Sequence, residues 1–131
     1  MRILLVEDDP TTSRSIELML THANLNVYCT DMGEDGIDLA KLYDYDLILL
    51  DLNLPDMSGI DILKRIEETA YIKTTPVVVL TTTDDEQEIK RCYELGCNVY
   101  VTKPVNYDNF ANAIRQLGLF FSVIKVPPVK T

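Results

Sequence analysis

The sequence has few residues that bind soft metals or form disulfides. It contains three cysteines, Cys29, Cys92 and Cys97, without a C-x-x-C pair, and a single histidine, His22, near a predicted helix end. An odd number of cysteines among apolar neighbours is typical of reduced, partly buried thiols. We therefore expect no disulfide framework, and we expect His22 to cap a helix or to face solvent.

Long hydrophobic runs are also missing. No apolar stretch approaches the roughly 20 residues that a membrane-spanning helix needs. The N-terminus reaches the acidic triplet Glu7-Asp8-Asp9 where a signal peptide would carry its apolar core. The sequence therefore predicts a cytoplasmic protein that does not enter a membrane.

Basic residues are scarce. The chain has 12 lysines and arginines against 21 aspartates and glutamates, which gives a net charge of −9. Because nucleic-acid phosphates attract basic surfaces, we expect no direct nucleic-acid binding. The chain also lacks the loops G-x-x-x-x-G-K-[ST] and G-x-G-x-x-G, so we expect no ATP site.

Length and composition are those of one globular domain. The chain has 131 residues, of which 47% are hydrophobic and 25% charged, which is close to the average of folded proteins. We assign residues 1–121 to the domain and residues 122–131 to a C-terminal tail. The tail is expected to be extended because Val126-Pro127-Pro128 cannot continue a helix.

Short apolar runs alternate with segments of helical periodicity. Most of the runs are continuous, which is typical of strands covered on both faces. They occupy residues 3–6, 27–29, 47–50, 77–80 and 99–101. Helices are predicted at residues 10–22, about 34–43, 58–68 and about 107–121. A further helix is predicted to begin at a capping box of Thr83 and Glu86 and to end at Gly96. This alternation predicts an α/β fold, a (βα)5 doubly wound, flavodoxin-like parallel sheet with strand order 2-1-3-4-5.

Reactive side chains follow four of these runs, at the points where the predicted strands end. They are Glu7 and Asp8, Asp51, Thr81, and Lys103 with Pro104. A parallel sheet gathers the carboxyl ends of its strands at one edge, where ligands bind. The cluster so assembled suits transfer of a phosphoryl group to the carboxylate of Asp51.

A divalent cation is needed for that chemistry, because a carboxylate and a phosphoryl group are both negative. Mg²⁺ prefers oxygen ligands and keeps several waters. We expect Asp8 and Asp51 to bind it directly and Glu7 to hold one of its waters. The Lys103 ammonium would contact another phosphoryl oxygen as a point charge.

The ordered motifs resemble the receiver domain of bacterial two-component response regulators over roughly residues 2–118. The residues that carry the resemblance are Val6-Glu7-Asp8-Asp9, Asp51 in Leu50-Asp51-Leu52-Asn53-Leu54-Pro55-Asp56-Met57-Ser58-Gly59, Thr81, Tyr100 and Lys103-Pro104. Residues 1–66 are similar to the receiver of an alphaproteobacterial cell-cycle transcription regulator. The C-terminal segment resembles stand-alone receivers paired with bacterial phytochromes.

The resemblance implies a phosphoacceptor signalling switch of a two-component system or phosphorelay, and not an enzyme in the usual sense. The donor would be a phosphohistidine on a sensor histidine kinase or histidine phosphotransfer protein, and the output would reach a downstream protein target. The backbone carbonyl of Asn53 would be a further Mg²⁺ ligand, and the Lys103-Pro104 peptide would be cis. Thr81 would bind a phosphoryl oxygen and Tyr100 would turn inward, changing the face formed by the 99–101 strand and the helices on either side of it.

The end of the last predicted helix is unusually apolar. It includes Phe120 and Phe121, and one helix cannot bury every side of such a run. We expect these residues to form an interface, either with a partner or in a homodimer.

Three alternatives compete with the receiver interpretation. A Mg²⁺-dependent aspartyl-phosphate phosphatase of the haloacid dehalogenase type needs a second acid two residues after its nucleophile, where this chain has Asn53. A flavin-binding module would need a phosphate-binding loop after the first strand, where this chain is acidic. The third alternative is a receiver cut from a longer DNA-binding regulator.

Overall fold

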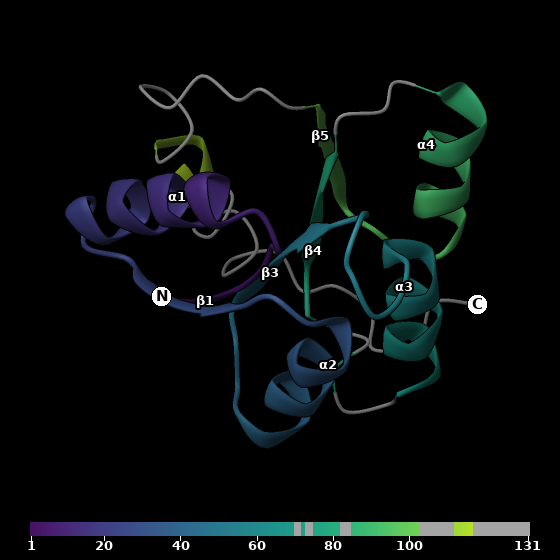
Figure 1. Ribbon diagram of the computed structural model, residues 1–131, viewed down its shortest axis with the longest axis horizontal. Helices are drawn as coiled ribbons and strands as arrows, with labels where there is room; N and C mark the ends of the chain where they lie inside the picture. The colour runs from purple at the N-terminus through teal and green to yellow at the C-terminus, as the bar shows by residue number, and fades with distance from the viewer. Residues whose placement is uncertain (70–71, 73–74, 82–84, 103–111, 117–131) are drawn as a thin grey trace.

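The computed structural model describes residues 1–69, 72, 75–81, 85–102 and 112–116. Its core is one sheet of five parallel strands (Figure 1). The strands are β1 (Arg2–Val6), β2 (Asn26–Thr30), β3 (Leu47–Asp51), β4 (Val77–Thr81) and β5 (Val99–Thr102). Their order is β2-β1-β3-β4-β5, which confirms the predicted doubly wound topology.

The register of the strands brings their carboxyl ends to one edge. Val6, the last residue of β1, pairs with Leu50, so that Glu7 and Asp51 continue side by side. Asp51 pairs in turn with Leu80, and Thr81 pairs with Thr102 at the end of β5. The predicted meeting of distant residues at this edge therefore holds for Glu7, Asp51 and Thr81.

Most of the described helices begin directly after a capping side chain. They are α1 (Pro10–His22), α2 (Gly33–Leu42), α3 (Gly59–Glu68) and α4 (Glu86–Glu94), and residues 112–116 are also helical. Asp9 caps α1 by accepting a hydrogen bond from the Thr12 N–H, and Pro10 occupies the first turn. α4 begins later than the predicted capping box, because Asp85 is its N-cap and accepts from the Gln87 N–H.

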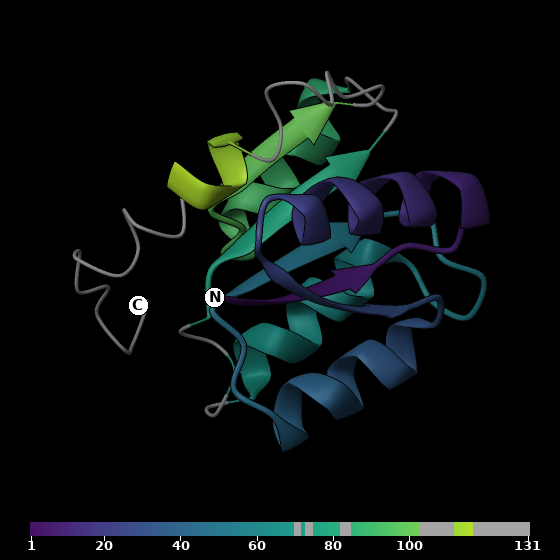
Figure 2. The same ribbon diagram turned by 90° about the vertical axis from the view of Figure 1, so that its left-hand side faces the viewer.

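Helices cover the two faces of the sheet (Figure 2), and an apolar layer lies on each face. One layer packs Ile16 and Leu20 of α1, together with Ile114, against alternate residues of the strands. The other packs residues of α2, α3 and α4, such as Ile37 and Ile62, against the intervening strand residues. The sheet is therefore buried on both sides, as βαβ crossovers require.

The edge strand β2 differs from the prediction of strands covered on both faces. β1, β3 and β4 are buried, whereas Tyr28 of β2 is 44% exposed and Cys29 is also exposed. Arg2 lies over the rings of Tyr28, Tyr43 and Tyr45, with its guanidinium carbon 5.3 to 5.8 Å from their centroids. These cation–π contacts partly cover an edge that no helix covers completely.

One prediction concerns residues outside this description. The division into a domain at 1–121 and a tail at 122–131 falls in residues 117–131, which lie outside the described part of the chain. For the part that is described, no helix has the length and apolar character needed to cross a membrane.

Candidate functional site

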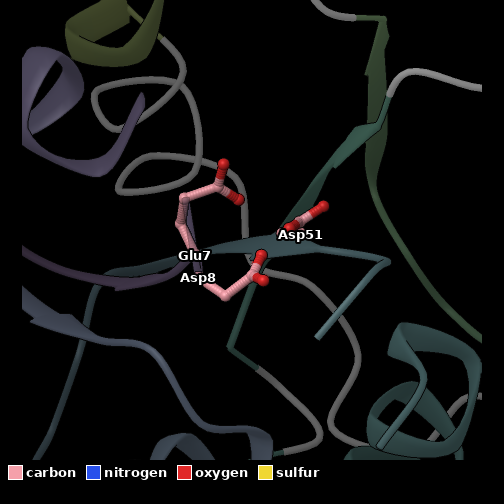
Figure 3. Close-up of side chains that lie close together, drawn as sticks. All are labelled: Glu7, Asp8 and Asp51. Atoms are coloured by element: carbon pink, nitrogen blue, oxygen red, sulfur yellow. The ribbon is translucent and has the colours of Figure 1, made fainter. Parts of the chain in front are cut away.

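Three carboxylates meet at the carboxyl edge of the sheet. Glu7 and Asp8 follow β1 and Asp51 ends β3, and one oxygen of each lies within 4.8 Å of the others (Figure 3). Glu7 and Asp8 lie in the segment between the end of β1 and the start of α1. The structure thus brings together the three acidic residues that the sequence placed at one site.

Burial differs sharply among these carboxylates. Asp51 is 4% exposed and Glu7 only 2%, whereas Asp8 is exposed at the rim. The Asn53 N–H donates a hydrogen bond to Asp51 Oδ1 at 3.2 Å. These three carboxylates, the acidic pocket, therefore combine two buried groups with one exposed group.

The donor set fits a hard divalent cation. Buried like charges raise the free energy of the folded state unless a cation or hydrogen-bond donors compensate them. All three side chains supply oxygen, the atom that Mg²⁺ and Ca²⁺ prefer, and the exposed Asp8 leaves room for water. The acidic pocket therefore has the composition of a divalent-ion site.

The predicted switch residues lie on the neighbouring strands. Thr81 ends β4 and is fully buried. Tyr100 lies in β5 opposite Val79 and is partly buried against the layer that includes α4. Asp51, Thr81 and Tyr100 therefore lie on three adjacent strands of the sheet.

Several predicted residues lie outside the described part of the chain. They are Lys103 and Pro104, which follow β5 directly in the sequence, and Phe120 and Phe121 near the C-terminus. Their predicted contacts with phosphoryl oxygen, the cis peptide and the interface are not tested by the structure.

A hollow opens between α1 and β2, and Glu7 and Asp8 form part of its lining. It has a volume of about 430 Å³, and its lining includes Asp8, Arg14, Glu17, Cys29 and Asp31. The Cys29 thiol donates to Glu17 Oε2 at 3.4 Å. Partial burial and this carboxylate raise the pKa of Cys29 to about 11. Cys29 is therefore exposed and contacts an acid, which differs from the predicted partly buried thiol among apolar neighbours. Cys92 and Cys97 are buried, as predicted.

Asp56 is the residue of this region that the sequence analysis missed. It lies in the loop after β3, and its two carboxylate oxygens accept hydrogen bonds from the N–H groups of Gly33 and Glu34 at 2.7 and 2.9 Å. These donors, Glu34 first, lower the pKa of the Asp56 carboxyl. The sequence contained a signal that the cap of α2 comes from another segment. Met32, which precedes α2, has no side-chain oxygen with which to cap that helix.

Comparison with known proteins gives consistent relatives. The family described as "Response regulator receiver domain" matches residues 3–115. The cell cycle transcriptional regulator CtrA of Caulobacter vibrioides is 46% identical over 130 residues, which cover 95% of this chain and 55% of that protein. The chain thus spans about half the length of the curated relatives it matches. This similarity extends well beyond residues 1–66, where the sequence resemblance to a cell-cycle regulator was noted.

Solved structures agree with this result. The receiver domain of a response regulator from Rhodospirillum rubrum is 49% identical and covers 100% of both chains, with a TM-score of 0.77. The Mn²⁺-bound form of the response regulator Rcp1 is 31% identical and covers 96% of this chain and 98% of that one, with a TM-score of 0.76. Together with the fold and the acidic edge of the sheet, these matches show that the chain belongs to the response regulator receiver domain family.

Proposed function

We propose that this protein is a phosphoacceptor switch of a two-component system or phosphorelay and that Asp51 is the residue that is phosphorylated. The observation that carries this proposal is the buried carboxylate of Asp51, with oxygens of Glu7 and Asp8 within 4.8 Å, at the carboxyl edge of a receiver-family sheet. Receiver domains are signalling phosphoacceptors rather than classical enzymes, and this membership argues against the phosphatase and flavin-module alternatives.

The proposed metal is Mg²⁺. Asp8, Asp51 and the backbone carbonyl of Asn53 would bind it, and Glu7 would hold one of its waters. When bound, the ion neutralises the negative charge of the acidic pocket and of the incoming phosphoryl group. The oxygen-only donor set supports this choice, as does the Mn²⁺-bound form of the relative Rcp1.

The transfer step needs a donor from another protein. Receiver domains interact with histidine kinases or phosphotransfer proteins, and we propose a phosphohistidine on one of these as the donor. A carboxylate oxygen of Asp51 forms a bond to phosphorus, the P–N bond breaks, and the imidazole leaves with the electron pair and takes up a proton. The Asn53 N–H, which contacts Asp51 Oδ1, holds the carboxylate in one orientation during this step.

The remaining roles concern the phosphorylated state. Lys103 would pair with a phosphoryl oxygen, aimed by a cis peptide bond before Pro104. Thr81 would donate its hydroxyl hydrogen to another oxygen, and Tyr100 would then turn inward. The fully buried position of Thr81 at the end of β4 supports this route to α4 and β5.

Intact mass spectrometry tests the nucleophile. We expect wild type incubated with Mg²⁺ and acetyl phosphate to gain one phosphoryl group, and Asp51→Ala to gain none. Asp38→Ala is the matched control, because Asp38 is an exposed acid in α2, and it should be labelled like wild type. Equal labelling of wild type and Asp51→Ala would show that the nucleophile is misassigned.

A second candidate is the receiver part of a longer DNA-binding regulator. It is favoured by the CtrA relatives, which are named as transcriptional regulators and are about twice as long as this chain. In that case the downstream target is an attached DNA-binding domain. A stand-alone receiver would instead act on a separate protein, with Phe120 and Phe121 as a partner or homodimer interface and residues 122–131 as a tail. The genomic reading frame around Thr131 separates the two cases.

A further inference from the structure

The start of α2 receives its cap from a distant loop. Met32 occupies the N-cap position in an extended conformation, with φ −123° and ψ 135°. The first N–H groups of a helix need acceptors, and a negative charge there is favoured by the helix dipole. Asp56, which is 23 residues from Gly33 and 22 from Glu34 in the sequence, supplies both acceptors.

That loop, residues 52–58, is closed at its base. Asn53 and Ser58 form an antiparallel bridge, and the Gly59 N–H donates to the Leu52 carbonyl at 2.8 Å. Ser58 also caps α3 by accepting from the Asp61 N–H at 3.2 Å. The base of the loop is therefore held by α3, and its tip is held by α2 through Asp56.

The loop and α2 are in close contact around this cap. A Cβ atom at Gly33 would lie 2.5 Å from Cγ of Met57, the residue after Asp56, and 2.8 Å from Cδ1 of Ile62. Glu34 forms an ion pair with Arg65 of α3 at 2.5 Å. Asp56 is thus part of a packed junction, so its hydrogen bonds fix the position of the loop tip.

The same loop carries Asn53 into the acidic pocket. The Asn53 N–H contacts Asp51 Oδ1, and the Asn53 carbonyl is the proposed backbone ligand of Mg²⁺. A displacement of the loop would move both groups relative to the carboxylates. Groups that hold metal ligands in place typically change metal affinity by about 10- to 100-fold when they are removed.

We propose that Asp56 is a positioning residue for the divalent-ion site, acting through the 52–58 loop on Asn53. This inference rests on the proposed function, because it takes Asn53 as a metal ligand. Asp56 touches neither the ion nor the phosphoryl group in this scheme. It couples the start of α2 to the geometry of the phosphorylation pocket.

The experiment measures Mg²⁺ affinity by NMR titration of wild type, Asp56→Ala, Asp56→Asn and the control Asp38→Ala. The control removes one negative charge from the exposed face of α2 without touching the loop. We expect the dissociation constant of Asp56→Ala to be at least about tenfold higher than that of Asp38→Ala. Asp56→Asn keeps one acceptor oxygen, so its affinity should fall between the two.

Two further readouts separate positioning from general destabilisation. All titrations are run at a temperature at which circular dichroism shows every variant to be folded. In Asp56→Ala without Mg²⁺, the amide signal of Asn53 should shift together with those of Gly33 and Glu34. A loss of stability alone would not move the Asn53 signal.

The outcomes distinguish this inference from the function on which it rests. If wild type is phosphorylated at Asp51 but the affinities of Asp56→Ala and Asp38→Ala differ by less than about threefold, the role of Asp56 is refuted and the proposed function stands. If wild type shows no Mg²⁺-dependent labelling at Asp51, both are refuted.

Discussion

At the residue scale, the pocket contrasts two buried carboxylates with an exposed one. Glu7 and Asp51 are held inside by their place at the ends of buried strands, while Asp8 reaches the rim. Removing carboxylates from water is unfavourable unless opposite charge compensates them. We therefore expect a divalent ion to stabilise the fold and to depend on Asp8.

Mg²⁺ should raise the free energy of unfolding. At a concentration 100 times the dissociation constant, a ligand that binds only the folded state adds about 2.7 kcal/mol. Asp8→Asn should lose most of this gain, because it removes one of the three carboxylates of the ion site. Urea denaturation followed by circular dichroism measures both effects, with Asp38→Asn as the control. Superimposable wild-type curves with and without Mg²⁺ would contradict the proposed ion site.

Cys29 should react slowly with thiol reagents although it is exposed. Its pKa is raised to about 11 by partial burial and by Glu17, and only the thiolate is nucleophilic. The rate of alkylation should therefore keep rising as the pH increases towards 11. Glu17→Gln should react faster at pH 8, because the charge that opposes ionisation is removed.

Mass spectrometry of the alkylated protein checks this prediction. Cys92 and Cys97 are buried and serve as internal controls. An equal rate at Cys29 in wild type and Glu17→Gln would show that the carboxylate does not control the thiol.

At the element scale, a local cap was enough to predict the start of α1. The pair Asp9-Pro10 fixed the start of α1, which runs from Pro10 to His22 as expected. The predicted start of α4 at a capping box of Thr83 and Glu86 was wrong, because Asp85 is the N-cap and the helix begins at Glu86. The cap of α2 could not be predicted, because Asp56 reaches it only after β3 has paired with β1.

Gly59 is a position at which closely packed backbone leaves no room for a side chain. A Cβ there would lie 2.6 Å from the Leu52 Cα and 2.5 Å from the Leu52 Cδ2. Because the backbone of the 52–58 loop cannot move without breaking its base, Gly59→Ala should destabilise the protein by about 3 kcal/mol, the upper end of overpacking costs.

Gly36 gives the matched control for this substitution. A Cβ at Gly36 would meet only side-chain methyl groups of Val6 and Thr30, the nearest at 2.9 Å. Side chains adjust more easily than backbone, so Gly36→Ala should cost less in the same urea experiment. A larger effect at Gly36 than at Gly59 would refute the packing argument.

At the scale of the whole molecule, the site is joined to distant surfaces by the sheet. β3 carries Asp51, β4 carries Thr81 and β5 carries Tyr100, so adjacent strands lead from the acidic pocket to the layer packed against α4. On the opposite layer, Arg115 Nη2 donates to the Ala23 carbonyl at 2.5 Å and ties the last described helical residues to the end of α1. The expected output of the proposed switch is an inward turn of Tyr100 that changes the surface formed by α4 and β5.

A phosphoryl mimic should reveal this coupling. With Mg²⁺ and beryllofluoride, we expect the NMR amide signals of Thr81 and Tyr100 to shift, because the added acceptor atoms draw the Thr81 hydroxyl towards Asp51. Asp51→Ala should show no such shifts. Unchanged signals at Thr81 and Tyr100 in wild type would show that the proposed switching route is wrong.

The sequence by itself determined what depends on local pattern. Continuous apolar runs and the caps near them specify strands and helices, and their alternation specifies a parallel sheet with its strand ends at one edge. That was enough to predict the strand order and the meeting of Glu7, Asp8 and Asp51. It was not enough to show that β2 is open to solvent, because position in a sheet is a property of the assembled fold.

Only the tertiary structure decided which groups are buried and which distant groups touch. Glu7 and Asp8 are adjacent and chemically alike, yet one is buried and the other exposed, because they face opposite sides of a chain that is leaving the sheet. The contacts of Asp56 with α2 and of Cys29 with Glu17 join segments that the sequence separates. Such contacts depend on the relative positions of packed elements, which no local periodicity encodes.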